Sequence, residues 1–256
     1  MVLKIDSKRV FWLLIGAIAV QLALNLVSIL AEFKMDPDKG KGLVSLFSMD
    51  HERSVPTMFS SVLLLIAATV LMLIAKAERI EKRSARPWFA LAGIFLFLSV
   101  DEFASIHERL ISPTRDLLNA SGLFYSAWVI PYGVLLLVFV LSFRGFLNRL
   151  STTVRSLILL AGALYVFGAI GFESLGGWHF ETVEKRTVEY AVLYTCEEVL
   201  EMVGVSIFLY SLLVYLSGRT ESLSFEFKAQ NAHENAESRT NRRCMEPERK
   251  LAEPTI

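Results

Sequence analysis

Six apolar stretches of about 20 residues alternate with short polar segments along the first 217 residues of the chain. A helix rises about 1.5 Å per residue, so a helix of this length crosses a hydrocarbon core of about 30 Å. The pattern therefore predicts an all-α, polytopic membrane bundle of six transmembrane helices. The expected spans cover about residues 10–30, 56–75, 88–108, 124–143, 156–176 and 189–216.

The segments outside these spans are polar. Residues 31–55 are expected to form a loop between the first two helices. Residues 218–256 lack a sustained apolar period, so we expect a disordered cytoplasmic tail there. The chain is thus divided into a helical bundle, residues 1–217, and this tail.

Composition agrees with a membrane protein. Hydrophobic residues make up 54% of the chain and the mean hydropathy is +0.48, which excludes an ordinary soluble domain. The 26 basic residues balance the 26 acidic ones, so no nucleic-acid surface is expected. We therefore expect the protein to be embedded in the lipid bilayer.

The distribution of Lys and Arg predicts the orientation of the bundle. With the N-terminus in the cytoplasm, the cytoplasmic segments hold 18 of these residues and the opposite loops hold 8. Cytoplasmic loops of membrane proteins carry the excess of basic residues. Both termini are therefore expected in the cytoplasm, and the bias suits a bacterial cytoplasmic (inner) membrane.

Acidic residues interrupt three of the apolar stretches. An ionised side chain inside a bilayer costs about 2.5 kcal/mol or more, so it usually faces a partner or water and marks function. Helical rise places all of these acids in the same outer half of the membrane. The set, with one histidine among them, is Asp101, Glu102, His107, Glu108, Glu173, Glu197, Glu198 and Glu201.

Helical phase predicts how these residues face one another. If the third span continues as a helix to residue 108, Asp101, Ser105 and Glu108 share one face. On the sixth span, Tyr194 lies in one polar stripe with the glutamates 197, 198 and 201. Two such stripes predict an outward-facing cavity lined by carboxylates. His51 and His179 are expected in loops over its mouth.

The first interpretation of this cavity is a metal-binding site, which would also suit a metal-dependent enzyme. Carboxylates with an imidazole suit iron, manganese or zinc. No Glu-x-x-His spacing of the di-iron bundles is present, so no reaction is assigned. The candidate metal ligands are Asp101, His107, Glu108, Glu197 and Glu201, and the additional residues of the polar cavity are Glu102, Ser105, Glu173, Tyr194 and Glu198.

Two other interpretations stay open at this point. Buried acids also form proton and cation pathways, so a coupled transporter, which with six spans would work as a homodimer, is the second hypothesis. In a structural or interaction protein, the acids would instead pair with Arg109, Arg115 or Arg186, or with tyrosine hydroxyls. The sequence names no substrate for any of the three.

Overall fold

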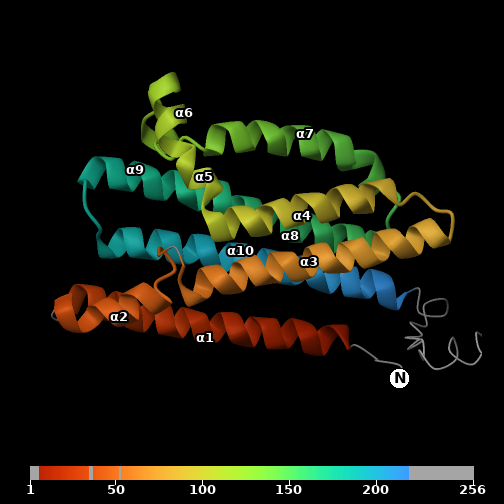
Figure 1. Cartoon of the computed structure of the whole chain (residues 1–256), viewed down its shortest axis with the longest axis horizontal. Coiled ribbons are helices and arrows are strands. Elements are labelled where there is room, and N and C mark those ends of the chain that lie inside the picture. The colour runs from red at the N-terminus through yellow and green to blue at the C-terminus, as the bar shows by residue number, and fades with distance from the viewer. Residues whose placement is uncertain (1–5, 35–36, 52, 219–256) are drawn as a thin grey trace, which may run out of the picture. The chain divides into compact units, whose positions relative to one another are not determined.

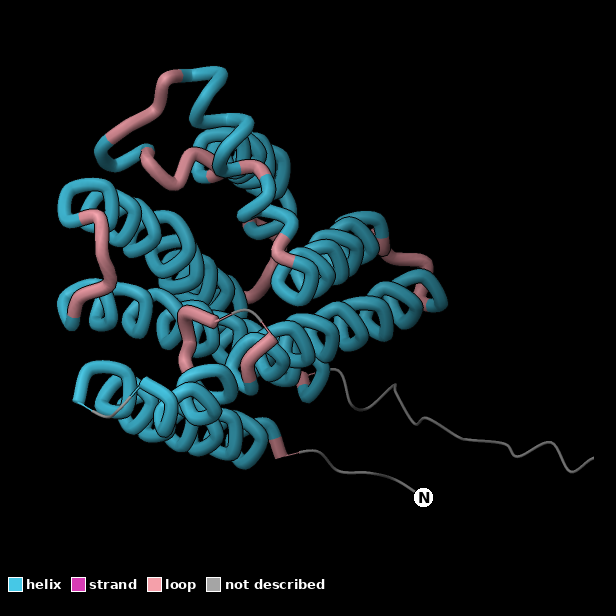
Figure 2. Tube along the Cα trace, turned by 60° about the vertical axis from the view of Figure 1, so that its left-hand side comes forward, coloured by secondary structure: helices cyan, strands magenta, loops and turns pink. Residues whose placement is uncertain are grey.

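The computed structural model describes residues 6–34, 37–51 and 53–218, and every structural statement below refers to these residues. All their regular elements are helices, joined by short loops (Figures 1 and 2). In chain order they are α1 (Ser7–Lys34), α2 (Pro37–Phe47), α3 (Val55–Ile80), α4 (Arg86–Ala104), α5 (Ile106–Arg109), α6 (Ile111–Leu118), the 3-10 turn η1 (Gly122–Phe124), α7 (Val129–Leu147), α8 (Thr152–Val166), the π-helical segment η2 (Phe167–Phe172), α9 (Glu173–Val183) and α10 (Val188–Ser217).

The all-α prediction with six spans is confirmed. Six of the described helical stretches are long and apolar enough to cross a membrane: α1, α3, α4, α7, the continuous run α8–η2–α9, and α10. The predicted tail at 218–256 lies outside the described residues apart from residue 218. The orientation of the termini stays a prediction.

The spans alternate in direction, so the bundle has two distinct ends. We call the end where α1, α4 and α9 finish the acidic end, because the carboxylates of interest lie towards it. At the opposite, terminal end, α1 begins, α10 finishes, and the loops α3–α4 and α7–α8 turn. In Figure 1 the acidic end, with α2 and α6, is on the left.

Local sequence signals fix where several helices begin. Ser54 caps α3, since its hydroxyl accepts a hydrogen bond from the Thr57 amide at 3.3 Å, and Pro56 follows in the first turn. Thr187 caps α10 in the same way, accepting from the Tyr190 amide at 3.2 Å. These caps satisfy amides that would otherwise lack partners at the acidic end.

The packed core lies between α3, α4, α8 and α10. Leu71, Trp88 and Leu212 are among its fully buried side chains. Helices α3 and α4 are also joined by two reciprocal hydrogen bonds of 2.8 Å: the Ser61 hydroxyl donates to the Ser99 carbonyl, and the Ser99 hydroxyl donates to the Ser61 carbonyl. Small hydroxyl residues of this kind let membrane helices approach closely.

Helix α7 is packed differently from the core helices. Val129, at its start, is its one buried residue. Figure 1 shows α7 beyond α4 and α8, away from α3 and α10. Its two ends are attached by aromatic contacts: Tyr132 with Phe97, ring centroids 6.5 Å apart, and Phe146 with Trp88, 4.9 Å apart. Between these attachments α7 forms one wall of a cavity.

Two local expectations from the sequence are wrong. The segment 31–55 is not a single loop, because α1 extends to Lys34 and α2 occupies Pro37–Phe47. The third span does not continue to residue 108, because α4 ends at Ala104 and Ser105 adopts a left-handed conformation with φ of 49°. That break changes how the acidic residues of this segment are arranged.

Candidate functional site

A cavity of about 1310 Å³ lies between α4, α7, α8 and α10 and extends from the loops of the acidic end towards the terminal end. Its volume exceeds the range of about 300–1,000 Å³ that is usual for small-molecule sites. We call it the central cavity. The charged residues of its lining gather towards the acidic end.

The part of the cavity nearer the terminal end is apolar. Phe139 and Phe143 line it from α7, with ring centroids 4.5 Å apart. On the facing wall Phe95 of α4 is stacked on Phe208 of α10 at 4.4 Å. At the far end of this apolar part, Phe146 lies edge-on against the buried ring of Trp88. This part offers hydrocarbon and aromatic surface and no charge.

The part nearer the acidic end gathers the carboxylates. Nine of the ten residues predicted for the polar cavity line it, and Ser105 is the exception. Of these nine, Asp101 and Tyr194 are buried and Glu108 is exposed, so Glu108 lies at the rim. The nine are Asp101, Glu102, His107, Glu108, Glu173, Tyr194, Glu197, Glu198 and Glu201.

Asp101 and His107 form a pair created by the break after α4. One Asp101 oxygen accepts a hydrogen bond from the His107 backbone amide at 2.8 Å, and the other lies 3.3 Å from the imidazole Nδ1. Burial lowers the pKa of His107, but the hydrogen bond and charge of Asp101, with the nearby glutamates, outweigh it and raise the pKa from 6.5 to about 9. The imidazole is therefore a cation at neutral pH.

This pair corrects the helical phase inferred from the sequence. Asp101, Ser105 and Glu108 do not share a helix face, because the left-handed Ser105 redirects the chain into α5. Asp101 contacts His107, whereas Glu102 is the α4 carboxylate that lies beside Glu201 of α10. The α4 and α10 acids therefore meet through Glu102.

A second carboxylate pair joins the fifth and sixth spans. Glu197 of α10 lies beside Glu173, the first residue of α9. The chain reaches this point through η2, where a Cβ added to Gly168 would lie 2.8 Å from the Glu197 carbonyl. Only glycine permits that approach. The π-helical segment shifts the phase of the fifth span, as π-bulges near functional sites commonly do.

Aromatic side chains lie beside the acids, and the apolar pattern of the sequence did not indicate them. The ring of Trp128 lies against that of His107 at an angle of 55°, with centroids 4.8 Å apart, and its indole nitrogen donates to Glu173 at 3.2 Å. Tyr132 lies beside Asp101, and Tyr165 beside Glu201. Such residues have no sequence signal beyond their apolar surroundings, because only the fold brings α7 and α8 against the acids.

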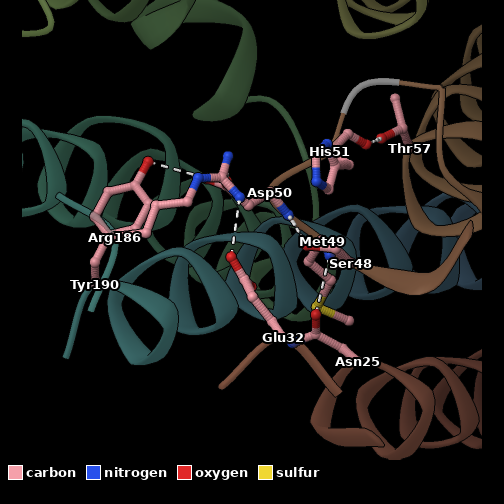
Figure 3. Close-up of polar contacts among 9 residues, drawn as sticks. All are labelled: Asn25, Glu32, Ser48, Met49, Asp50, His51, Thr57, Arg186 and Tyr190. Atoms are coloured by element: carbon pink, nitrogen blue, oxygen red, sulfur yellow. Dashed lines mark hydrogen bonds and ion pairs between the residues drawn. The ribbon is translucent and has the colours of Figure 1, made fainter. Parts of the chain in front are cut away.

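A salt-bridge network stands at the mouth of the cavity (Figure 3). Arg186, in the α9–α10 loop, contacts the carboxylate of Asp50 and lies 3.6 Å from Glu32 of α1. The Tyr190 hydroxyl donates to Asp50 at 2.9 Å. Burial raises the pKa of Asp50 above its usual value, although Arg186 and Tyr190 oppose the rise. Under the structural alternative, the sequence had offered Arg186 as one partner for the membrane acids, but here it contacts Asp50 and Glu32.

The network is anchored to the bundle by Asn25. Its side-chain amide donates to Thr195 of α10 at 2.8 Å and accepts from the Met49 backbone amide at 3.0 Å. Asn25 is completely buried on α1. It therefore fixes the segment that carries Asp50 and His51 at the mouth of the cavity (Figure 3).

The predicted position of one histidine is also wrong. His179 is not in a loop but in α9, where its Nε2 lies 2.8 Å from the Thr187 hydroxyl, outside the cavity lining. His51 does lie between α2 and α3 and lines the cavity.

The metal-binding interpretation is contradicted. Over residues 6–34, 37–51 and 53–218 no group of three or more His, Cys, Asp or Glu side chains is arranged to hold a metal ion. The physical reason is that the acids reach the cavity as pairs, Asp101 with His107, Glu102 with Glu201 and Glu173 with Glu197, and not as three side chains that converge on one point. The transporter and structural alternatives stay predictions from the sequence.

Fold and cavity together define a class: an integral membrane protein of six apolar helices with an internal cavity that is acidic at one end and apolar at the other. The family described as Domain of unknown function (DUF8692) matches residues 8–216. The chain belongs to this family. No curated protein and no solved structure matches it.

Proposed function

We propose that the protein binds an amphipathic, lipid-like molecule inside the membrane. Its polar head would lie among the carboxylates of the acidic end and its hydrocarbon chain between α4, α7 and α8. The observation that carries the proposal is the segregation of the cavity lining, from Glu102 and Glu197 at one end to Phe139 and Phe143 at the other. A molecule with the same division satisfies both ends at once.

The size and the wall of the cavity support a lipid-like ligand. From Tyr132 to Phe146, both in the lining, α7 rises about 21 Å at 1.5 Å per residue, which suits one long hydrocarbon chain. Leu135 and Val138 of α7 line the cavity and are 62% and 56% exposed. Helix α7, in which Val129 is the one buried residue, is thus little covered by other helices, which favours entry of a lipid from the bilayer beside it.

The proposal is tested by filling the apolar part of the cavity with larger side chains while its charged residues stay unchanged. Gly93 of α4 and Gly162 of α8 line the cavity, and a Cβ on either meets nothing within 4 Å. The double variant Gly93→Leu/Gly162→Leu places two side chains in the apolar region. The matched control is Gly16→Leu/Gly145→Leu, two exposed helix glycines with equal space outside the lining.

Binding is measured by native mass spectrometry, with hexadecanol, hexadecylamine and hexadecanoate titrated separately. We expect at least one probe to bind wild type and the control variant saturably with one molecule per chain. The cavity-filled variant should bind that probe at least about tenfold more weakly, a loss of about 1.4 kcal/mol. The proposal fails if none of the probes binds saturably, or if filling the cavity leaves binding unchanged.

The loop charges support a proposal for orientation: both termini in the cytoplasm of a bacterial cytoplasmic membrane, with the acidic end outside. Ser84, in the α3–α4 loop, and Leu117, on α6, are exposed at opposite ends. In a cysteine-free background, a membrane-impermeant thiol reagent should label Leu117→Cys in intact spheroplasts, and Ser84→Cys only after lysis. The reverse labelling pattern would show that the acidic end faces the cytoplasm. A homodimer stays a prediction.

A further inference from the structure

The acidic end of the central cavity holds more carboxylates than cations. Glu102, Glu173, Glu197 and Glu201 come from three spans and lie close together. His107 is the cationic neighbour of Glu102 and Glu201, and its imidazole is paired with Asp101. Carboxylates gathered away from bulk water are stabilised by a positive charge placed among them.

The two arginines that line the cavity are held elsewhere. Arg186 bridges Asp50 and Glu32 at the mouth. Arg115 lies over the Tyr125 ring, 3.7 Å from its centroid, and its Nε donates to the Tyr125 carbonyl at 2.8 Å. Both arginines therefore have their partners outside the group of four glutamates. The charge missing from this group has to come from a ligand or from protons.

The aromatic rings of the same region indicate the kind of cation. Trp128, Tyr132 and Tyr165 line the cavity beside the acids, and Tyr190 and Tyr194 line it from α10. Aromatic faces attract organic ammonium groups, and Trp and Tyr are the rings most used for this purpose. A small inorganic ion needs several oxygens converging on one point, and no such group is present in the described part of the chain.

We propose that the head group of the bound amphiphile is an organic ammonium, placed between Glu102 and Glu201 on one side and Glu173 and Glu197 on the other. This proposal rests on the proposed function, because it names the head group of the molecule that occupies the same cavity. An anionic head would meet like charges at this end. A neutral hydroxyl head would make hydrogen bonds but supply no positive charge to these carboxylates.

The experiment compares head groups on one chain. Hexadecylamine, hexadecanol and hexadecanoate are titrated against wild type, Glu102→Gln, Glu197→Gln and the control Glu184→Gln. Glu184 is an exposed acid at the end of α9, outside the cavity lining. Each Glu→Gln change keeps the size of the side chain and removes its charge. Binding of hexadecanol reports whether the fold and the apolar part remain intact.

We expect wild type and Glu184→Gln to bind hexadecylamine at least about tenfold more tightly than hexadecanol, the scale of one charge-assisted hydrogen bond. Glu102→Gln and Glu197→Gln should each lose most of this preference while hexadecanol binding stays within about twofold of wild type.

Three other results would contradict this proposal, and they distinguish a wrong head group from a wrong proposed function. If the three probes bind equally, or hexadecanoate binds best, the cavity binds amphiphiles and the ammonium assignment is wrong. If the amine preference survives both Glu→Gln changes, the ammonium is not held by these carboxylates. If none of the probes binds, the proposed function fails together with this inference.

Discussion

The imidazole of His107 folds back onto the carboxylate of Asp101, which receives both the His107 backbone amide at 2.8 Å and the ring Nδ1 at 3.3 Å. This contact closes the turn at Ser105 and ends α4 at the acidic end. A membrane helix thus stops at a charged pair formed by Asp101 in its last turn and His107, three positions beyond its last residue. The pair gives the local structure a dependence on pH.

The first prediction concerns that dependence. Because the pKa of His107 is raised to about 9, the stabilisation from its charge is complete below the ordinary value of 6.5 and is lost as pH rises through about 9. The melting temperature of His107→Gln in detergent should therefore lie furthest below that of wild type near pH 6. The difference should shrink between about pH 7 and 9.5. In an Asp101→Asn background this dependence on pH should become weaker, because Asp101 contributes most to raising the pKa of His107. A difference that does not vary with pH in the native background would contradict the ion pair.

The second prediction concerns the mouth of the cavity. Arg186→Gln leaves the carboxylate of Asp50, whose side chain is 10% exposed, without its cation. Since Arg186 itself is 38% exposed, we expect a loss of about 1–3 kcal/mol in unfolding free energy, less than for a fully buried pair. Combining Arg186→Gln with Asp50→Asn should cost less than the sum of the single changes. Strict additivity in this double-mutant cycle would show that the two side chains are not coupled.

The third prediction tests the close packing of α8 against α10. A Cβ on Gly204 would lie 2.9 Å from the Ala161 carbonyl oxygen and 2.9 Å from the Tyr165 amide nitrogen. Gly204→Ala should therefore destabilise the protein by about 1–3 kcal/mol. The control Gly162→Ala, where a Cβ meets nothing within 4 Å, should be neutral or stabilise by up to about 1 kcal/mol. Equal effects of the two substitutions on thermal stability would argue against this helix contact.

The fourth prediction concerns the reciprocal serine contact between α3 and α4. Ser61→Ala and Ser99→Ala each remove a 2.8 Å donor to the facing helix, and each should cost about 0.6–1.7 kcal/mol, as interhelical hydrogen bonds in membranes do. Thr69→Ala is the matched control, because its hydroxyl donates within α3 to Leu65 and is exposed. If Thr69→Ala costs as much in denaturant unfolding, the serine contact has no special role.

Periodicity was sufficient to predict the six helices. An apolar run of span length leaves few alternatives to a helix in lipid, because every backbone group must be paired within the segment. The ends were harder. The break at Ser105 depends on the side chain of Asp101, which accepts a hydrogen bond from the backbone amide six positions later. The pattern of apolar residues does not predict such a contact.

The acidic end was predicted only in part. From helical rise alone, Glu173, Glu197 and Glu201 are predicted at a common depth in the membrane. All three line one cavity in the structure. Neither the partner of Arg186 nor the position of Trp128 could be read from the sequence. These contacts join segments far apart in the chain, and they depend on the packing of α1, α7 and α10 rather than on local pattern.

We propose that the cavity holds an amphiphile with its ammonium head among the carboxylates. A crystal structure of the protein with hexadecylamine that carries a terminal bromine tests it most directly. We predict an anomalous bromine peak beside Phe139 and Phe143, with density for the amine within hydrogen-bonding distance of Glu102 or Glu197. A bromine peak at the acidic end, or density confined to the outer surface of the bundle, would show that the ammonium and the hydrocarbon chain are not placed as proposed.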